Sequence, residues 1–145
     1  MKLTIKLFLP FLILILFSSS LYAQKTEKSA KETTLETDFS DRQAVITATE
    51  NFFIGDHTGS IKHKKLSMHE KGAYRYINRN GEYSESVFQL DSDDSDTNYK
   101  EELLSVEIYG KLALARVRLD QFQREQPEYK LMTLHKASNI WKITS

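Results

Sequence analysis

The chain has 145 residues, with 20 basic and 20 acidic side chains, four histidines and no cysteine. This balanced charge argues against a nucleic-acid-binding protein, which would carry a basic face to neutralise phosphates. Because disulfides are excluded, core packing alone must hold the fold together.

The N-terminal segment has the features of a secretory signal peptide. Lys2 and Lys6 supply positive charge, residues 7–17 form an apolar run, and Ala23 closes a stretch suited to cleavage. The run is too short to cross a bilayer, so we expect no membrane span in the mature protein. We therefore expect an exported protein, periplasmic or secreted, that has a net charge of −2 once residues 1–23 are removed.

Residues 24–38 are polar and charged, with Leu35 as their only large apolar side chain. Such a segment buries too little surface to offset the entropy lost on ordering, which predicts a flexible linker. Residues 39–145 have the length of one domain and show no internal repeat. The predicted organisation is a signal peptide (1–23), a linker (24–38) and a single domain (39–145).

The domain is predicted to begin with two helices. Ser40 and Gln43 form a capping-box pattern that predicts a helix start at Ser40, and Gly55 is expected to end this helix. Ser60 is expected to cap a second, short helix over residues 61–66. Apolar residues recur at helical spacing along the first helix: Val45, Ala48, Phe52 and Phe53.

The periodicity then changes to that of strands. Residues 73–77 are aromatic and strand-like, and Asn80 with Gly81 predicts a hairpin turn, because both residues tolerate positive φ. Residues 84–90 are predicted to form a short helix, and residues 91–96 an acidic loop.

Long antiparallel strands are predicted from Tyr99 to the end of the chain. Turns around Gly110 and at residues 137–139, together with a polar loop that contains Pro127, are expected to divide this region into about four strands. On the first of these strands, one face is expected to carry Leu104, Val106 and Ile108. Helices gathered at the start and strands at the end predict the α+β class.

Four sequence stretches carry a resemblance to a known superfamily. They are FFIGDHTG at the end of the first helix, LSMHEKGA, VEIYGKLALARVRL and the closing LMTLHKASNIWKI. Together with the order of elements, they resemble the nuclear transport factor 2-like superfamily, which includes ketosteroid isomerases and polyketide cyclases. Within it, the chain is most similar to a small exported bacterial branch labelled lumazine-binding. The resemblance implies a cone-shaped fold in which a curved antiparallel sheet of about five or six strands packs on N-terminal helices.

In that fold, the sheet and the first helix enclose a pocket that is open at one end. A ligand pocket needs apolar walls and a few placed polar groups. The aromatic residues of the chain could equally be ordinary core, since large aromatics dominate core burial. The candidate ligand-binding residues are Phe52, Phe53, His69, Tyr74, Tyr76, Phe88 and Trp141.

His69 and Asp56 are the candidates for proton transfer. The isomerase and cyclase relatives imply a buried Asp or His that moves a proton beside a carbonyl, with a tyrosine stabilising the enolate. His69 could act as the base and Tyr74 or Tyr76 as the donor. Asp56 lies in a Gly-Asp-His turn, where an exposed loop carboxylate is the simpler interpretation.

Metal and cofactor signatures are weak. No two histidines are spaced four residues apart and there is no cysteine, so zinc is not expected. No glycine-rich phosphate loop is present, and we expect no cofactor. The acidic loop matches four positions of a calcium-loop pattern but has Asp96 where that loop needs glycine, so a solvated loop is favoured.

Three functions remain open from the sequence. The first is a non-catalytic protein that binds a small apolar or aromatic ligand, and the second an isomerase or cyclase-type enzyme that uses His69 with a tyrosine. The third is a protein-interaction module of the cell envelope, which includes a homodimer formed through the sheet. Leu112 and Leu114 share a strand face with Arg116 and Arg118, which suits an interface with an apolar centre and a charged rim.

Overall fold

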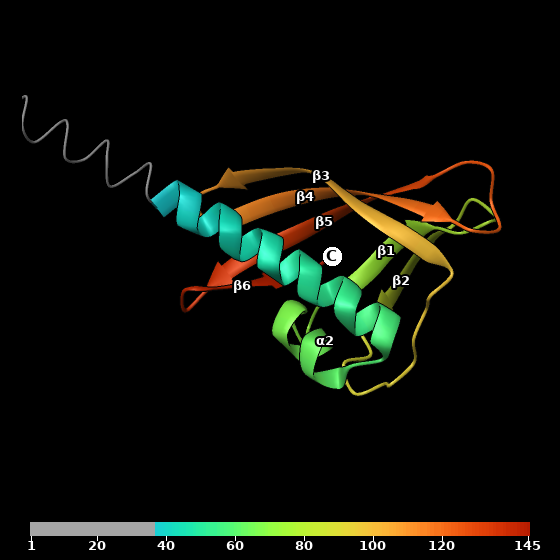
Figure 1. Ribbon diagram of the computed structural model, residues 1–145, viewed down its shortest axis with the longest axis horizontal. Helices are drawn as coiled ribbons and strands as arrows, with labels where there is room; N and C mark the ends of the chain where they lie inside the picture. The colour runs from blue at the N-terminus through green and yellow to red at the C-terminus, as the bar shows by residue number, and fades with distance from the viewer. Residues whose placement is uncertain (1–36) are drawn as a thin grey trace, which may run out of the picture. The chain divides into compact units, whose positions relative to one another are not determined.

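The computed structural model describes residues 37–145, so the predicted signal peptide and most of the predicted linker lie outside the described residues. Within the described residues, Ser40–Ser145 form one compact unit that contains α2 and all six described strands (Figure 1). After a long helix that reaches residue 58, the elements follow in this order: α2 (Ile61–Ser67), β1 (Ala73–Ile77), β2 (Tyr83–Val87), β3 (Tyr99–Tyr109), β4 (Leu112–Gln121), β5 (Glu128–Ala137) and β6 (Ile140–Ile143).

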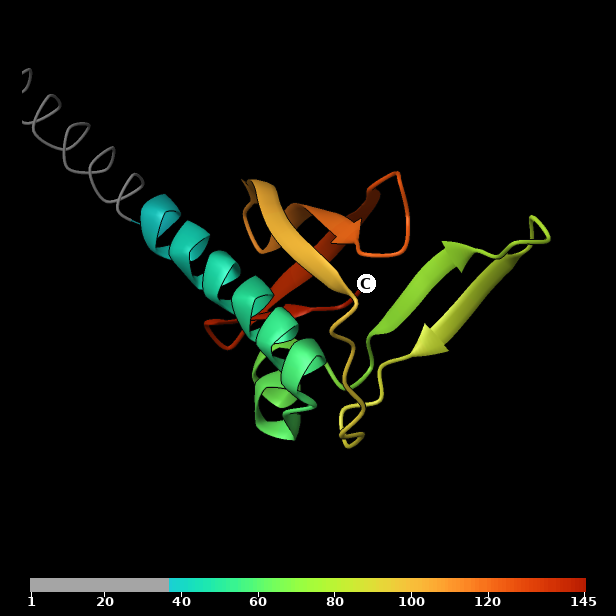
Figure 2. The ribbon, with the colours of Figure 1, turned by 45° about the vertical axis from the view of Figure 1, so that its right-hand side comes forward.

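The strands form two antiparallel sheets. β3, β4, β5 and β6 make a four-stranded sheet in sequence order, and β1 pairs with β2 alone. Figure 2 shows the β1–β2 hairpin lying apart from the larger sheet. The α+β class predicted from the sequence is confirmed.

The first helix is longer than predicted at both ends. Residues 37–39 are already helical, so the predicted start at Ser40 is wrong, and the helix continues past Gly55 to residue 58. Gly55 serves packing instead, because a Cβ there would lie 2.9 Å from the backbone nitrogen of Lys64 in α2. Gly59, with φ +69°, follows the helix end, as a left-handed glycine commonly does. Within residues 37–145, no helix is long and apolar enough to cross a membrane.

The core lies between the first helix and the inner face of the four-stranded sheet. The helix contributes Val45, Ala48, Phe52 and Phe53 to it. On β4 the buried side chains alternate, and the fully buried Ala113 and Ala115 are small enough to sit beneath the helix. Full burial of a larger side chain contributes about 1.5–3 kcal/mol. The sheet contributes Val106, Ala113, Ala115, Val117, Leu119, Met132, Leu134, Trp141 and Ile143.

Several local predictions are confirmed. α2 begins at Ile61, as expected, although the Ser60 side chain contacts the His63 ring at 2.8 Å instead of capping the helix. The Asn80-Gly81 hairpin joins β1 to β2, with Gly81 at φ +83°. The last turn places Ser138 and Asn139 at positive φ between β5 and β6.

Two local predictions are wrong. Residues 84–90 do not form a helix, because Tyr83–Val87 is the strand that pairs with β1. In β3 the pairing with β4 is irregular between Leu103 and Ser105, and one extra residue changes the face on which the following side chains lie. Leu104 is therefore exposed, and Leu103 packs against the core in its place.

Gly59 has a left-handed backbone conformation and also lies close to the loop residue Asp93. A Cβ at this position would lie 2.1 Å from the carbonyl oxygen of Asp93. We expect Gly59→Ala to lower the free energy of unfolding by about 3 kcal/mol or more, as measured by urea denaturation. Gly81→Ala is the matched control, because its φ is also positive but nothing lies within 4 Å of the added Cβ, so its cost should be about 1–2 kcal/mol. Equal losses in the two variants would show that contact with Asp93 imposes no constraint.

Candidate functional site

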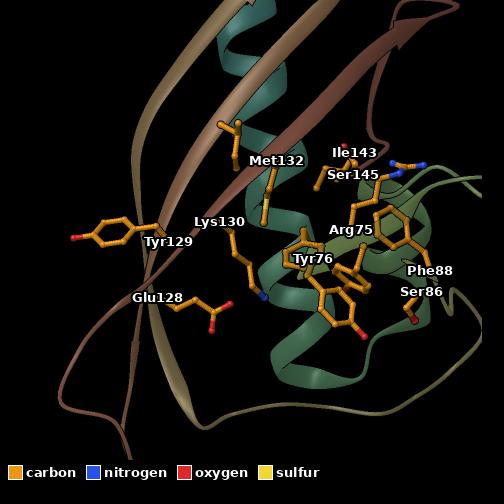
Figure 3. Close-up of a pocket in the computed structure, with 13 residues that line it drawn as sticks. Arg75, Tyr76, Ser86, Phe88, Glu128, Tyr129, Lys130, Met132, Ile143 and Ser145 are labelled. Carbon is orange, nitrogen blue, oxygen red and sulfur yellow. The ribbon is translucent and has the colours of Figure 1, made fainter. Parts of the chain in front are cut away.

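A cavity lies between the β1–β2 hairpin and β5, next to the end of β6 (Figure 3). Its volume is about 600 Å³. Residues from the first helix, both sheets and the segment after β6 line it: Phe52, Tyr74, Arg75, Tyr76, Ser86, Phe88, Glu128, Tyr129, Lys130, Leu131, Met132, Ile143 and Ser145.

The wall on the hairpin side is aromatic. The rings of Tyr74 and Phe88 meet edge to face, with their centroids 4.8 Å apart. Phe88 is buried directly after β2, and a Cβ on Gly72 would lie 2.4 Å from its ring. Gly72 therefore has no side chain because the Phe88 ring occupies that space, and this packing fixes the ring in the cavity wall.

The wall on the β5 side is polar. Side chains alternate along a strand, and in Figure 3 Glu128, Lys130 and Met132 extend toward the cavity while Tyr129 points away. Glu128 accepts a hydrogen bond from Gln121 Nε2 at 2.7 Å and lies 3.8 Å from Arg124. This carboxylate is therefore held by the end of β4 and the loop that precedes β5.

Four of the seven residues predicted to bind ligand line this cavity, namely Phe52, Tyr74, Tyr76 and Phe88. The other three lie elsewhere. Phe53 packs edge to face on Phe52 at 5.1 Å and on Tyr99 at 6.3 Å. His69 lies in the turn before β1, where its Nδ1 accepts a hydrogen bond from the Lys71 N–H at 3.0 Å. Trp141 is buried in the core.

Trp141 has a structural partner in the first helix. Its indole N–H donates to Asp41 Oδ1 at 3.2 Å, and Lys136 Nζ lies 2.5 Å from the same oxygen. The hydrogen bond from Lys136 is the main cause that holds the pKa of Asp41 below its usual range, and the Trp141 bond adds to it against the effect of burial. This contact ties the first helix to β5 and β6.

A smaller cavity of about 210 Å³ brings Asp56 and Tyr74 to one wall. Asp56 accepts a hydrogen bond from the Tyr99 hydroxyl. Burial, together with the nearby Asp56, raises the pKa of Tyr74 to about 12. Tyr74 is therefore a neutral phenol at physiological pH and can donate a hydrogen bond, but it cannot act as a base. His69 is not among the residues that line either cavity.

The structure also brings together a pair of residues that the sequence did not indicate. His57 directs Nδ1 at the Asp96 carbonyl oxygen, 2.8 Å away, and Nε2 at the Glu101 carboxylate, 2.7 Å away. Both neighbours are acceptors, so only the protonated ring satisfies both. Burial lowers the pKa of His57, but the bonds to Glu101 and Asp96 and the nearby carboxylates outweigh it, and the pKa is raised.

The acidic loop is attached to α2 by lysines. The buried Lys64 donates from Nζ to the carbonyl oxygens of Ser92 at 2.8 Å and Asp94 at 2.7 Å, and Lys65 pairs with Asp91 at 2.5 Å. Among residues 37–145 there is no group of three or more His, Cys, Asp or Glu side chains placed to hold a metal ion.

The His57–Glu101 pair predicts a pH dependence of stability. Because the folded-state pKa is raised above 6.5, its contribution is complete below about pH 6.5 and is lost as the pH rises through the folded value. Glu101→Gln should lower the pKa of His57 in an NMR titration and flatten the urea stability profile over that window. Glu102→Gln, an exposed neighbour on β3, should change neither. An unchanged His57 pKa in Glu101→Gln would contradict this assignment.

Comparisons with known proteins support the fold. No protein-family model and no curated protein matches the chain. Among solved structures, it is similar to a nuclear transport factor 2-like protein of unknown function from Shewanella baltica, with a TM-score of 0.62, 13% identity, and coverage of 74% of this chain and 90% of that one. A second such protein, from Silicibacter pomeroyi, gives a TM-score of 0.59 and 16% identity, with coverage of 74% and 93%. The chain therefore has a nuclear transport factor 2-like fold.

Proposed function

We propose that this chain is an exported, non-catalytic binding protein that holds a small apolar or aromatic ligand in the cavity between the β1–β2 hairpin and β5. The observation that carries the proposal is the aromatic wall of Tyr74, Tyr76 and Phe88 around about 600 Å³ of space. Pockets for small molecules typically measure roughly 300–1,000 Å³ and are lined mainly by apolar and aromatic side chains. Phe52 supplies a further ring from the first helix.

The arrangement of polar groups favours binding over catalysis. An isomerase or cyclase-type reaction needs a base that faces the substrate beside a hydrogen-bond donor. The predicted base, His69, does not line the cavity, so the phenol of Tyr74, which can donate a hydrogen bond, lacks its predicted partner there. Asp56 accepts the Tyr99 hydroxyl hydrogen bond and lines the smaller cavity instead.

Two finer parts of the proposal rest on the sequence. Export to the periplasm or the medium rests on the signal-peptide pattern of residues 1–23. Membership of the lumazine-binding branch rests on the sequence resemblance, and an aromatic wall is compatible with a flat ring as ligand.

Filling the cavity should abolish binding. Ser86 lines the cavity from β2, and Ser86→Trp places a bulky ring in that space. We expect the affinity for N-phenyl-1-naphthylamine, a neutral aromatic dye, to fall at least about ten-fold in a fluorescence titration. Tyr83→Trp is the control, because Tyr83 is an exposed residue that does not line the cavity and belongs to the opposite set of alternating side chains on β2. Dye binding that persists unchanged in Ser86→Trp would place the ligand elsewhere.

A second function is favoured by the outer face of the four-stranded sheet. Leu112 and Leu114 of β4 alternate with the buried set, and cross-strand pairing puts Glu107 and Thr133 on either side of Leu114. The same face bears further apolar side chains, of which three are strongly exposed: Tyr109, Tyr129 and Leu131. We propose that this face joins two copies of the chain in a homodimer, with Arg116 and Arg118 toward its charged rim.

Oligomeric state tests the outer face. Wild-type protein should elute with the mass of a dimer in size-exclusion chromatography with light scattering. Leu114→Lys should give a monomer, since it puts a charge into the apolar centre while Glu107 opposite can pair with it and preserve the fold. Ile77→Lys, which changes an exposed apolar residue of the hairpin, should stay dimeric. A monomeric wild-type protein would remove the homodimer and leave a different envelope protein as the partner of this face.

A further inference from the structure

Lys130 occupies an inward position on β5. It pairs across the sheet with Val117, which is fully buried on the inner face of β4, so the two side chains lie on the same side of the sheet. Lys130 is one of the residues that line the cavity, and Figure 3 shows its amino group extending from β5 toward Tyr76 on the hairpin. The ammonium group is therefore presented to whatever occupies the cavity.

The other charged side chains of the cavity wall already have partners. Arg75 Nε donates to Glu85 Oε2 at 2.9 Å across the β1–β2 pair. Glu128 is held by Gln121 and Arg124. The Lys130 ammonium, in contrast, makes no hydrogen bond or ion pair with any residue in the described range 37–145. Among the charged side chains of the wall, Lys130 is therefore the one without a direct partner in the described residues.

We infer that the ligand is an aromatic acid, with a flat apolar body between the rings of the hairpin and a single anionic group on the Lys130 ammonium. This inference rests on the proposed binding function and specifies its ligand. A partly desolvated cation favours an anionic partner, because a charge removed from water without a partner is costly. A lysine presents a compact point charge, which suits a carboxylate or sulfonate without demanding a bidentate geometry.

The remaining wall groups fit the two halves of such a ligand. The rings of Tyr74, Tyr76 and Phe88 offer faces and edges for an aromatic body, and Met132 adds an adaptable thioether beside Lys130 on β5. The charge and the rings lie on opposite sides of the cavity, so the ligand must span from β5 to the hairpin.

Two dyes with the same ring system separate the charge from the aromatic body. N-phenyl-1-naphthylamine is neutral, and 1-anilinonaphthalene-8-sulfonate is the same molecule with one sulfonate group. The wild-type protein should bind the sulfonate dye more tightly than the neutral dye, and added salt should lower the affinity for the sulfonate dye only. Lys130→Met should lower the affinity for the sulfonate by about ten-fold or more and leave that for the neutral dye within about two-fold, as expected for loss of a charge-assisted bond.

The matched control is Lys100→Met, which removes the same charge from the exposed, outward-facing side of β3 and should leave both affinities unchanged. If Lys130→Met lowers the affinity for both dyes equally, Lys130 contributes only apolar contact and not its charge. If neither affinity changes, Lys130 is not part of the site. Either result overturns the inference. If Lys130→Met fails to fold, the salt dependence of the wild-type protein decides. If the wild-type protein binds neither dye, the proposed binding function itself is overturned. If it binds the neutral dye as tightly as the sulfonate dye, only the inference of an acidic ligand is overturned.

Discussion

The fold depends on the attachment of the loop between β2 and β3 to the end of the first helix. The Asp96 N–H donates to the Asp56 carbonyl at 2.9 Å, and the His57 ring reaches back to the Asp96 carbonyl. Lys64 of α2 donates hydrogen bonds to two further carbonyl oxygens of the loop. This loop contains several like charges, which would repel each other and stay solvated if their backbone were free. A buried ammonium and a protonated imidazole supply positive charge at its edge and make the compact path of the chain favourable.

That attachment also positions the candidate site. The loop begins directly after Phe88, whose ring lies against Tyr74 in the cavity wall, and ends at Tyr99, whose hydroxyl binds Asp56. Gly59 at the helix end allows this close approach, since a side chain there would collide with the Asp93 carbonyl of the loop. The FFIGDHTG stretch therefore has a structural role, because Asp56 and His57 form hydrogen bonds with the loop and with β3.

Local signals predicted the elements whose geometry is local. The Asn80-Gly81 turn and the alternation along β4 were both readable, because positive φ and a buried face each restrict residue types directly. β2 differs from the helix that its sequence predicts, because one face of Tyr-Ser-Glu-Ser-Val carries only small polar side chains and the segment becomes a strand through pairing with β1. The irregularity at Leu104 could not be predicted, because one extra residue in β3 is defined only relative to β4. In the site, the aromatic residues of the first helix and hairpin follow from the fold that the resemblance implies. Lys130 and the His57–Glu101 pair, whose members are 44 residues apart, depend on which strands and helices face each other.

The separation of the β1–β2 hairpin from the larger sheet has a thermodynamic consequence for recognition. A two-stranded sheet has little stability of its own in water. This hairpin is joined to the rest of the domain near its base, where Ala73 N–H donates to the Thr144 carbonyl, while the bond from Phe88 N–H to Gly72 only closes the hairpin itself. A ligand that touches both β5 and the hairpin must therefore restrict the motion of one wall of its own site, and part of the interaction energy is spent on that restriction. For the proposed ligand, the affinity would then depend on the freedom of the hairpin in the empty state as well as on the contacts made in the filled one.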